Sequence, residues 1–321
     1  MSQATLYIIG NGFDLYHRLK TGYHHFGLYL QANNPEIFGL FESYFGFPAF
    51  EEGEWPEEWN YFERGLANLE FEEVLEAYSD YIGDPGAPDF RDRDWHTYDY
   101  ILSDLVENLT TRLLESFKAF LQAVEFPILN SDLALKLDKK SLFFNFNYTD
   151  TLERYYGLDP YQIKYIHGKA LSDDKLVLGH GIDPKQFVEE DQKPPEGLTE
   201  EELGQWYDQM NDNYNYSYES GKSSLKSYYE KSQKKTADII KENKEYWASL
   251  KGIQRVIVLG HSLSDVDLPY FQVIIGAIDS ESTEWVVSYH SDSDKEKHLN
   301  TLINLGIMKE QIKLMKMTQL V

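Results

Sequence analysis

Short apolar runs, rich in β-branched and aromatic residues, recur in three blocks of the chain. Runs such as Leu6–Ile9 and Val256–Leu259 are followed at once by glycine, which favours buried strands of a parallel sheet over helices. On this pattern we predict strands at residues 6–9, 142–146, 164–166, 176–178, 256–259, 285–289 and 312–317.

Between these blocks the apolar positions recur at helical spacing. From Ile101 to Val124, leucine and phenylalanine follow one another at steps of three or four residues, which predicts an amphipathic helix. Residues 57–78 predict two shorter acidic helices, and residues 80–94, which contain Gly-Asp-Pro-Gly, predict a loop. Residues 224–247 are predicted to be helical, whereas the polar stretch before them is predicted to be a mobile lid or loop.

Strands separated by helices indicate an α/β fold with a Rossmann-like parallel sheet. We expect a single domain over residues 1–321, whose core combines residues 1–30, 140–182 and 252–321. A mostly helical insertion over residues 31–139 and a polar lid or helical insertion over residues 183–251 would interrupt this core.

The chain is strongly acidic, with a formal net charge of −24. Contacts to nucleic-acid phosphates need clustered lysine and arginine, so this charge disfavours nucleic acid as a partner. A nucleotide ligand remains compatible, because backbone N–H groups at a helix start bind anions. The sequence contains no cysteine, which fits a reducing, cytoplasmic location. No apolar run approaches the about 18 residues of a membrane span, and the first residues do not resemble a signal peptide.

The first candidate site is the turn after the first predicted strand, Gly10-Asn11-Gly12-Phe13-Asp14. A strand, a glycine turn and a helix form an anion site, since glycine lets backbone N–H groups approach a phosphate. The third glycine of the dinucleotide-binding fingerprint is absent, because Leu15 stands there. The alternative is a plain turn in which Asp14 caps the helix.

The second candidate is Asn147, which follows the predicted strand 142–146 and precedes a helix start. Thr149 or Asp150 would cap that helix, with Glu153 as the reciprocal partner. Capping does not account for Asn147, whose amide would point into the crevice where open parallel sheets bind ligands. The alternative is that this amide satisfies groups of the loop backbone.

The third candidate is a pair of histidines, each between a predicted strand and a glycine: His167 before Gly168, and His180 before Gly181. A neutral imidazole at such a strand end acts as a general base near neutral pH. A single histidine is more often structural than catalytic, and the pattern leaves open which of the two functions.

The fourth candidate is the turn Gly260-His261-Ser262-Leu263-Ser264, followed by Asp267. The two serines would bond a ribose or a phosphate, and Asp267 would cap the next helix, in whose first turn Pro269 fits. No Gly-x-Ser-x-Gly elbow is present, which argues against a serine hydrolase. The adjacent His24 and His25 would face different ways on a helix, so we expect no metal.

All four motifs stand at predicted strand ends, and the carboxyl ends of parallel strands share one edge of a sheet. Together the motifs resemble those of the AbiH family of bacterial abortive infection proteins. The resembling segments are residues 8–23 (IIGNGFDLYHRLKTGY), 59–63 (WNYFE), 146–153 (FNYTDTLE), 166–168 (IHG), 178–181 (LGHG) and 259–271 (LGHSLSDVDLPYF). The resemblance implies a phage-defence role, in which an infected cell stops growing or dies before phage are released, and a phage-derived trigger.

A more distant resemblance is to sirtuin-like NAD-consuming domains. Gly10 and Gly12 match their glycine loop, Asn147 their asparagine, His167 their catalytic histidine, and Gly260 and Ser262 their late turn. The resemblance implies NAD as substrate or ligand, with Asn147 and His167 at the nicotinamide ribose. The chain departs from the pattern at Thr149, where many such domains carry aspartate. It also lacks the cysteines of the sirtuin zinc module, which argues against protein deacetylation.

Three functions follow as hypotheses. The first is cleavage of the glycosidic bond of NAD or a related nucleotide, with Asn147 and His167 catalytic. Nucleotide-binding residues would be Gly10, Asn11, Gly12, Phe13, Asp14, His180, Gly260, His261, Ser262, Ser264 and Asp267. The second is a nucleotide-binding sensor or interaction module without catalysis. The third is a nuclease-type toxin, which would need a basic patch from the lysine-rich segment 222–244.

The tyrosine-rich insertion fits either a homo-oligomer surface or packing around the core.

Overall fold

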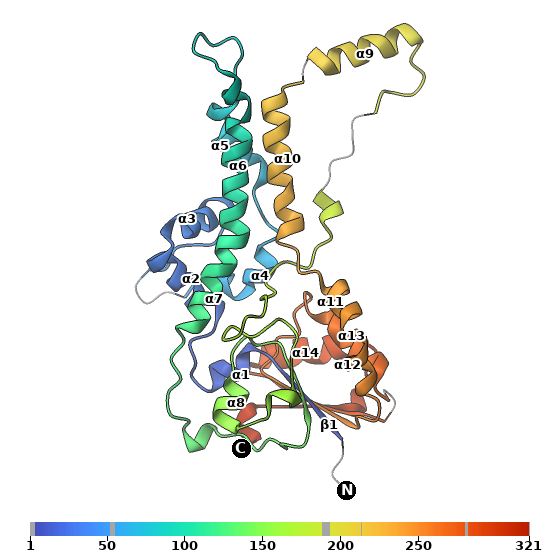
Figure 1. Ribbon diagram of the computed structural model, residues 1–321. Helices are drawn as coiled ribbons and strands as arrows, with labels where there is room; N and C mark the ends of the chain where they lie inside the picture. Colours follow the sequence, from blue (N-terminus) through green and yellow to red (C-terminus); the bar gives the residue numbers. More distant parts are fainter. Residues whose placement is uncertain (1–3, 52–54, 188–192, 213, 280–281, 321) are drawn as a thin grey trace.

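A computed structural model of the chain describes residues 4–51, 55–187, 193–212, 214–279 and 282–320 (Figure 1). Its core is a sheet of six parallel strands in the order β3-β2-β1-β4-β5-β6. The strands are β1 (Thr5–Ile9), β2 (Leu142–Asn145), β3 (Ile163–Tyr165), β4 (Arg255–Leu259), β5 (Glu284–Ser288) and β6 (Ile312–Met315). This strand order is that of a doubly wound Rossmann sheet, so the predicted fold class is confirmed.

The sheet has two apolar faces, because successive side chains of a strand point to opposite sides. Tyr7 and Ile9 of β1 pack with α1 (Asn11–Tyr16) and α8 (Thr151–Tyr156). Leu6 and Ile8 pack on the other face with α12 (Lys244–Ser249), α13 (Leu268–Ala277) and α14 (Asp292–Asn304). Helix α11 (Thr236–Glu242) lies beside α13 (Figure 1).

The predicted strand at 176–178 is wrong. Its leucines turn away from the sheet and pack in the apolar cluster of the helical insertion, where Leu176 is buried. The backbone between them bonds locally: Val177 N–H donates to the His167 carbonyl at 3.0 Å, and the Tyr148 hydroxyl donates to the Val177 carbonyl at 2.7 Å. A short apolar run alone does not say which hydrophobic cluster will bury it.

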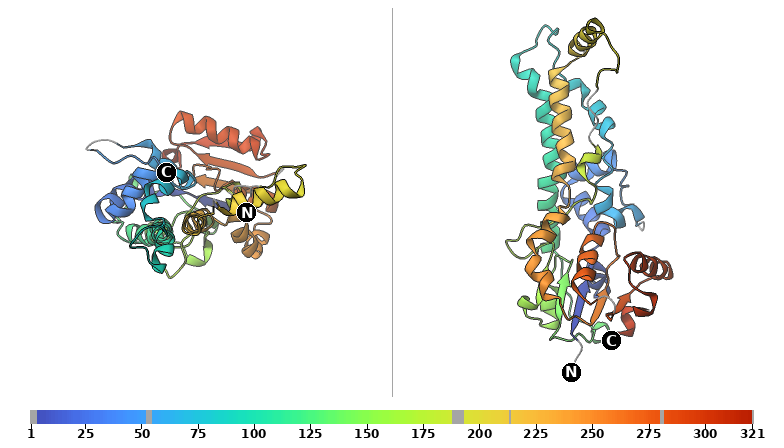
Figure 2. Two further views of the ribbon diagram at one scale, coloured as in Figure 1. Left: turned by 90° about the horizontal axis from the view of Figure 1, so that it is seen from above. Right: turned by 90° about the vertical axis from the view of Figure 1, so that its right-hand side faces the viewer.

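The insertions form a helical layer that rises from one side of the sheet (Figures 1 and 2). Its helices are α2 (Tyr23–Asn33), α3 (Pro35–Tyr44), α4 (Phe62–Gly65), α5 (Phe71–Ala77), α6 (Thr97–Glu107), a π-helical turn (Asn108–Arg112), α7 (Leu113–Gln122), α9 (Glu200–Asp212) and α10 (Tyr216–Lys231). Short 3₁₀ helices of the insertions are η1 (Glu57–Tyr61), η2 (Ser79–Tyr81), η3 (Asp92–His96), η5 (Ser131–Leu133) and η7 (Pro184–Phe187). Those of the core are η6 (Pro160–Gln162), η8 (Lys309–Gln311) and η9 (Met317–Gln319).

Helices α6 and α10 lie side by side along this layer, and we call the pair the helical arm (Figure 2). Their close approach depends on Gly221, where a Cβ atom would come within 2.3 Å of the Tyr98 ring. The predicted helix 101–124 corresponds to α6, the π-helical turn and α7, which follow one another without a break. Its first part, α6, is one of the two helices of the helical arm. The segment before residue 224 holds α9 and the first turns of α10 rather than only a loop; residues 188–192 and 213 of that segment lie outside the described ranges.

Within the described ranges, no helix combines the length and hydropathy needed to cross a bilayer.

Glycines let the turns after β1 and β4 touch at the centre of the sheet. Gly12 N–H donates to the Gly260 carbonyl at 2.7 Å, and Gly260 itself has a φ of +66°. A Cβ atom on Gly260 would lie 2.0 Å from the Phe13 nitrogen, and one on Gly10 would lie 2.5 Å from the His261 Cα. The residues after the two strands can meet only because these side chains are absent.

Gly260→Ala should therefore lower the free energy of unfolding by about 2–5 kcal/mol, the combined cost of a left-handed alanine and of an overpacked contact. Urea denaturation measures this change. Gly276→Ala is the matched control, because no atom lies within 4 Å of the added Cβ in this exposed position of α13. Equal stability of the two variants would contradict the packing argument.

Candidate functional site

Charged and imidazole side chains from five segments meet at the carboxyl edge of the sheet. His167 follows β3, His261 follows β4, Asp267 precedes α13, Glu63 lies in α4, and Lys234 lies between α10 and α11. We call these five residues the charged cluster. Asp267 is its centre: Oδ1 lies 2.9 Å from Lys234 Nζ and 3.7 Å from His167 Nε2, and Oδ2 lies 3.4 Å from His261 Nε2.

Lys234 joins the helical layer to the sheet. Its side chain is fully buried, and its ammonium contacts Asp267 at 2.9 Å and Glu63 at 3.2 Å. Burial disfavours the charged form, but the two carboxylates outweigh it and raise the pKa of Lys234 above its ordinary range. Burial also opposes the charge on Asp267, yet the Lys234 ammonium and a hydrogen bond from His261 hold the pKa of that carboxyl well below its ordinary value. Burial raises the pKa of Glu63, against the pull of Lys234.

The two histidines of the charged cluster differ in their hydrogen bonds. Leu263 N–H donates to His261 Nδ1 at 2.9 Å, so this nitrogen carries a lone pair and the ring proton sits on Nε2, facing Asp267. His167 Nε2 is buried and has no hydrogen-bond partner. Burial, assisted by Lys234, lowers the pKa of His167 well below its ordinary value. The lowered pKa keeps the His167 ring neutral near pH 7.

Aromatic rings enclose these histidines. The Phe146 ring lies 5.3 Å from the His167 ring and 4.4 Å from the His261 ring, centroid to centroid. The Tyr270 ring lies 5.7 Å from His167, and its hydroxyl is buried without a partner. These apolar walls shield the charged cluster from water and strengthen its electrostatic interactions.

Asn147 and Asp14 form a second polar group at the ends of β2 and β1. Asn147 is buried, its N–H donates to Asn145 Oδ1 at 3.0 Å, and its own Oδ1 has no partner. The Thr149 hydroxyl donates to Asp14 Oδ2 at 2.5 Å, while Asp14 Oδ1 is unpartnered. Burial raises the pKa of Asp14 to about 6, although the hydrogen bond from Thr149 lowers it.

His180 contrasts with His167, because both of its ring nitrogens are satisfied by backbone. Ile182 N–H donates to Nδ1 at 3.2 Å, and Nε2 donates to the Tyr229 carbonyl at 3.1 Å. The neighbouring backbone also pairs with the chain beyond α10, since Lys234 N–H donates to the His180 carbonyl at 2.8 Å. His180 therefore holds the segment that carries Lys234, and its ring has no nitrogen left for a ligand.

The remaining predicted residues surround these groups. The N–H groups of Gly10, Gly12 and Phe13 donate to carbonyls of Leu259, Gly260 and Gly10, so these amides already have protein acceptors. Asn11 bonds Thr21 through both ends of its amide. Ser262 is exposed and Ser264 half-buried on the turn before Asp267.

A comparison with protein families decides where the chain belongs. The family described as bacteriophage abortive infection AbiH matches residues 6–289. The chain belongs to the AbiH family. Family membership gives this protein a role in phage abortive infection, and the charged cluster, Asn147 and Asp14 all lie inside the matched range. Searches of the curated proteins and of the solved structures returned no significant match.

Helix capping does not explain the polar side chains of this AbiH-family protein. Asp267 and Asp150 are the N-cap residues of α13 and α8, but neither side chain makes a capping hydrogen bond. Asp14 lies within α1, and Glu153 binds Lys169 at 2.9 Å and the Tyr165 hydroxyl. The side chains of Asp14 and Asp267 are instead engaged in the two polar groups described above.

Sequence reasoning missed Glu63 and Lys234 as members of the site. Glu63 is the last residue of the segment 59–63 (WNYFE). That segment resembles the AbiH family, but its sequence pattern predicts no functional role for Glu63. Lys234 stands among several lysines of a polar stretch, and no local pattern separates it from its neighbours. Its burial depends on contacts 33 and 171 residues away along the chain.

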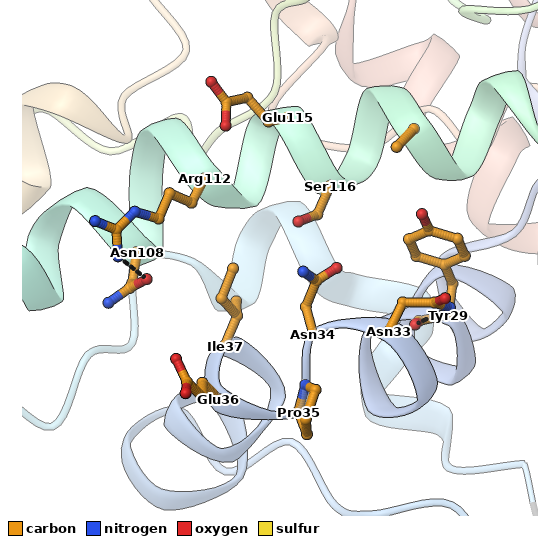
Figure 3. Close-up of a pocket in the computed structure, with 11 residues that line it drawn as sticks. Tyr29, Asn33, Asn34, Pro35, Glu36, Ile37, Asn108, Arg112, Glu115 and Ser116 are labelled. Carbon is orange, nitrogen blue, oxygen red and sulfur yellow. Dashed lines mark hydrogen bonds between the residues drawn. The ribbon is translucent and has the colours of Figure 1, made fainter.

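The helical layer also holds a polar cavity of about 590 Å³ between the α2–α3 junction and the π-helical turn (Figure 3). Arg112 lines it and is paired with Asn108 at 2.9 Å and Asp104 at 3.0 Å. None of the predicted site residues lines this cavity, so we place the candidate site at the sheet edge. Among the described residues, no group of three or more histidine, aspartate or glutamate side chains is arranged to hold a metal ion.

Lys234→Met should lower the free energy of unfolding by about 3–5 kcal/mol, because it leaves two buried carboxylates without their counter-ion. Adding Glu63→Gln should recover part of that loss. Urea denaturation at pH 7 measures both variants. The neighbouring exposed Lys235→Met is the control and should change stability by less than about 0.5 kcal/mol. An equally small effect at position 234 would contradict the pairing.

Asp14→Asn should stabilise the protein more at pH 7 than at pH 4. The pKa of Asp14 is about 6 in the folded state against 3.8 ordinarily, so the folded protein retains the proton while the unfolded chain loses it. The native aspartate therefore loses stability as pH rises from about 4 to about 6, by up to about 3 kcal/mol. Urea denaturation across this window measures the difference between variant and native protein. An exposed Asp80→Asn serves as the control, and a pH-independent difference for Asp14→Asn would refute the assignment.

Proposed function

We propose that this AbiH-family protein hydrolyses the N-glycosidic bond of NAD or of a related nucleotide. The observation that carries the proposal is a pair of buried polar atoms without partners, His167 Nε2 and Asn147 Oδ1, at the carboxyl edge of the sheet. A buried polar atom left unpaired costs about 1–3 kcal/mol, so such atoms call for an explanation, and a ligand group is one. Both positions are those of the sirtuin-like resemblance.

The position of these atoms in the fold supports a nucleotide. In doubly wound sheets ligands bind outside the carboxyl ends of the strands, where the strand order reverses. Here the reversal lies between β1 and β4, whose following turns touch at Gly12 and Gly260. Asn147 follows the neighbouring strand β2, and His167 follows β3.

The proposed reaction consumes one water molecule. The bond between ribose C1′ and the nicotinamide nitrogen breaks, and its electron pair returns to the ring, which leaves as neutral nicotinamide. The water oxygen bonds to C1′, and its proton passes to His167 Nε2 and then to solvent. ADP-ribose, nicotinamide and one proton are the products. Asn147 orients the water or the ribose hydroxyls through its free amide oxygen. Depletion of NAD would stop the metabolism of an infected cell.

The test is release of free nicotinamide from NAD by purified protein. His167→Ala and Asn147→Ala should each reduce the rate by about 10²–10⁴-fold, the usual contribution of a positioned acid–base group. The matched controls are His96→Ala and Asn300→Ala, which remove the same side chains at exposed positions of η3 and α14.

Thermal unfolding of every variant separates a catalytic loss from a folding defect. Unchanged release in His167→Ala would overturn the catalytic assignment. No release by the native protein, with or without phage-infected cell extract, would overturn hydrolysis of NAD.

A nucleotide sensor without catalysis is the second candidate, and the burial of the site favours it. His167 is only 2 % exposed and His261 only 4 %, which suits a ligand that is held rather than turned over. A nucleotide at 100 times its Kd would stabilise the fold by about 2.7 kcal/mol without product formation. The nuclease alternative needs a basic patch at 222–244, and Lys234 of that segment is buried in ion pairs.

A further inference from the structure

The charged cluster has more acid than base. Lys234 is its one fully buried ammonium, and it lies between two carboxylates. Both oxygens of Glu63 are acceptors, Oε1 from the Tyr23 hydroxyl at 2.8 Å and Oε2 from Lys234 at 3.2 Å, which is the pattern of an ionised carboxylate. Asp267 likewise accepts from Lys234 at one oxygen and faces His261 Nε2 with the other.

The histidines do not balance this charge. His261 accepts a backbone N–H at Nδ1, which fixes its neutral form. His167 Nε2 has no hydrogen-bond partner and lies 3.7 Å from Asp267 Oδ1. One ammonium against two carboxylates thus leaves one uncompensated negative charge in a site walled by Phe146 and Tyr270.

We propose that the charged cluster is the subsite for a positively charged base, so that the protein selects N-glycosyl pyridinium nucleotides over nucleotides with neutral bases. This inference rests on the proposed function and names the substrate class. A buried negative charge attracts a cation more strongly than it would in water. Phe146 and Tyr270 add aromatic rings, which also favour cations.

The same charge suits the bond cleavage. As the C1′–nitrogen bond breaks, positive charge moves from the base to the sugar, and a fixed carboxylate pair stabilises both positions. Lys234 is already neutralised by two carboxylates, so the cluster is a poor place for pyrophosphate. The nucleotide is therefore oriented with its cationic base at the charged cluster and its phosphates away from it.

The experiment compares NAD with NADH, whose nicotinamide ring differs by a hydride and lacks the positive charge. Isothermal titration calorimetry measures both affinities in the His167→Ala variant, so that turnover does not disturb the measurement. NAD should bind roughly tenfold more tightly than NADH, the size of effect that one charge a few ångströms away has on a neighbouring equilibrium. Glu63→Gln in the same background should bring the affinity ratio close to one.

Glu58→Gln, an exposed substitution of the same kind in the adjacent η1, should keep the tenfold ratio. Thermal unfolding checks that Glu63→Gln is folded, and Asp267→Asn removes the same charge if it is not. Equal affinities for NAD and NADH, or a ratio that neither substitution changes, would overturn the cation subsite even where nicotinamide is released. A preference for NAD without nicotinamide release would instead overturn hydrolysis and leave the subsite standing. Failure of both nucleotides to bind would overturn both proposals.

Discussion

The contact of one buried ammonium with two carboxylates is the constraint on which the architecture of the site depends. Lys234 comes from the connection after α10, Glu63 from α4 and Asp267 from the start of α13, so the ion pairs tie both insertions to the sheet. Because each charge is removed from water, none of the three is stable there without the others. The position of the helical layer over the carboxyl edge, and with it the closure around His167 and His261, follows from this requirement.

Glycine contacts bring the sheet-borne residues within reach of that layer. The touching turns at Gly12 and Gly260 fix the spacing between the ends of β1 and β4, and the side-chain hydroxyl of Ser288 supports Gly260 N–H at 2.8 Å from the next strand. Asn147 and His167 then follow from β2 and β3. The site is thus built from rigid strand ends on one side and from a single buried lysine on the other.

The sequence is sufficient to predict the sheet, because strands such as 6–9 and 256–259 are apolar, β-branched and bounded by glycine. It also identifies the edge of the sheet where polar side chains gather. The run at 176–178 is wrongly predicted as a strand because its leucines are buried against helices and not in the sheet. Composition alone does not distinguish these two kinds of burial. Local pattern equally fails to separate His167 from His180, since only tertiary contacts satisfy both nitrogens of the latter. Glu63 and Lys234 are invisible for the same reason: their partners are distant in the chain.

The mutual dependence of Glu63, Lys234 and Asp267 has an evolutionary consequence. A substitution at any one of them leaves a buried charge without its partner, which destabilises the fold. A lineage that loses the lysine is therefore expected to lose a carboxylate as well. Among AbiH relatives these three positions are expected to change together, as one inherited unit, while exposed neighbours such as Lys235 drift independently. Relatives that replace all three with uncharged side chains would mark a branch of the family in which the helical layer is joined to the sheet edge by apolar contacts instead.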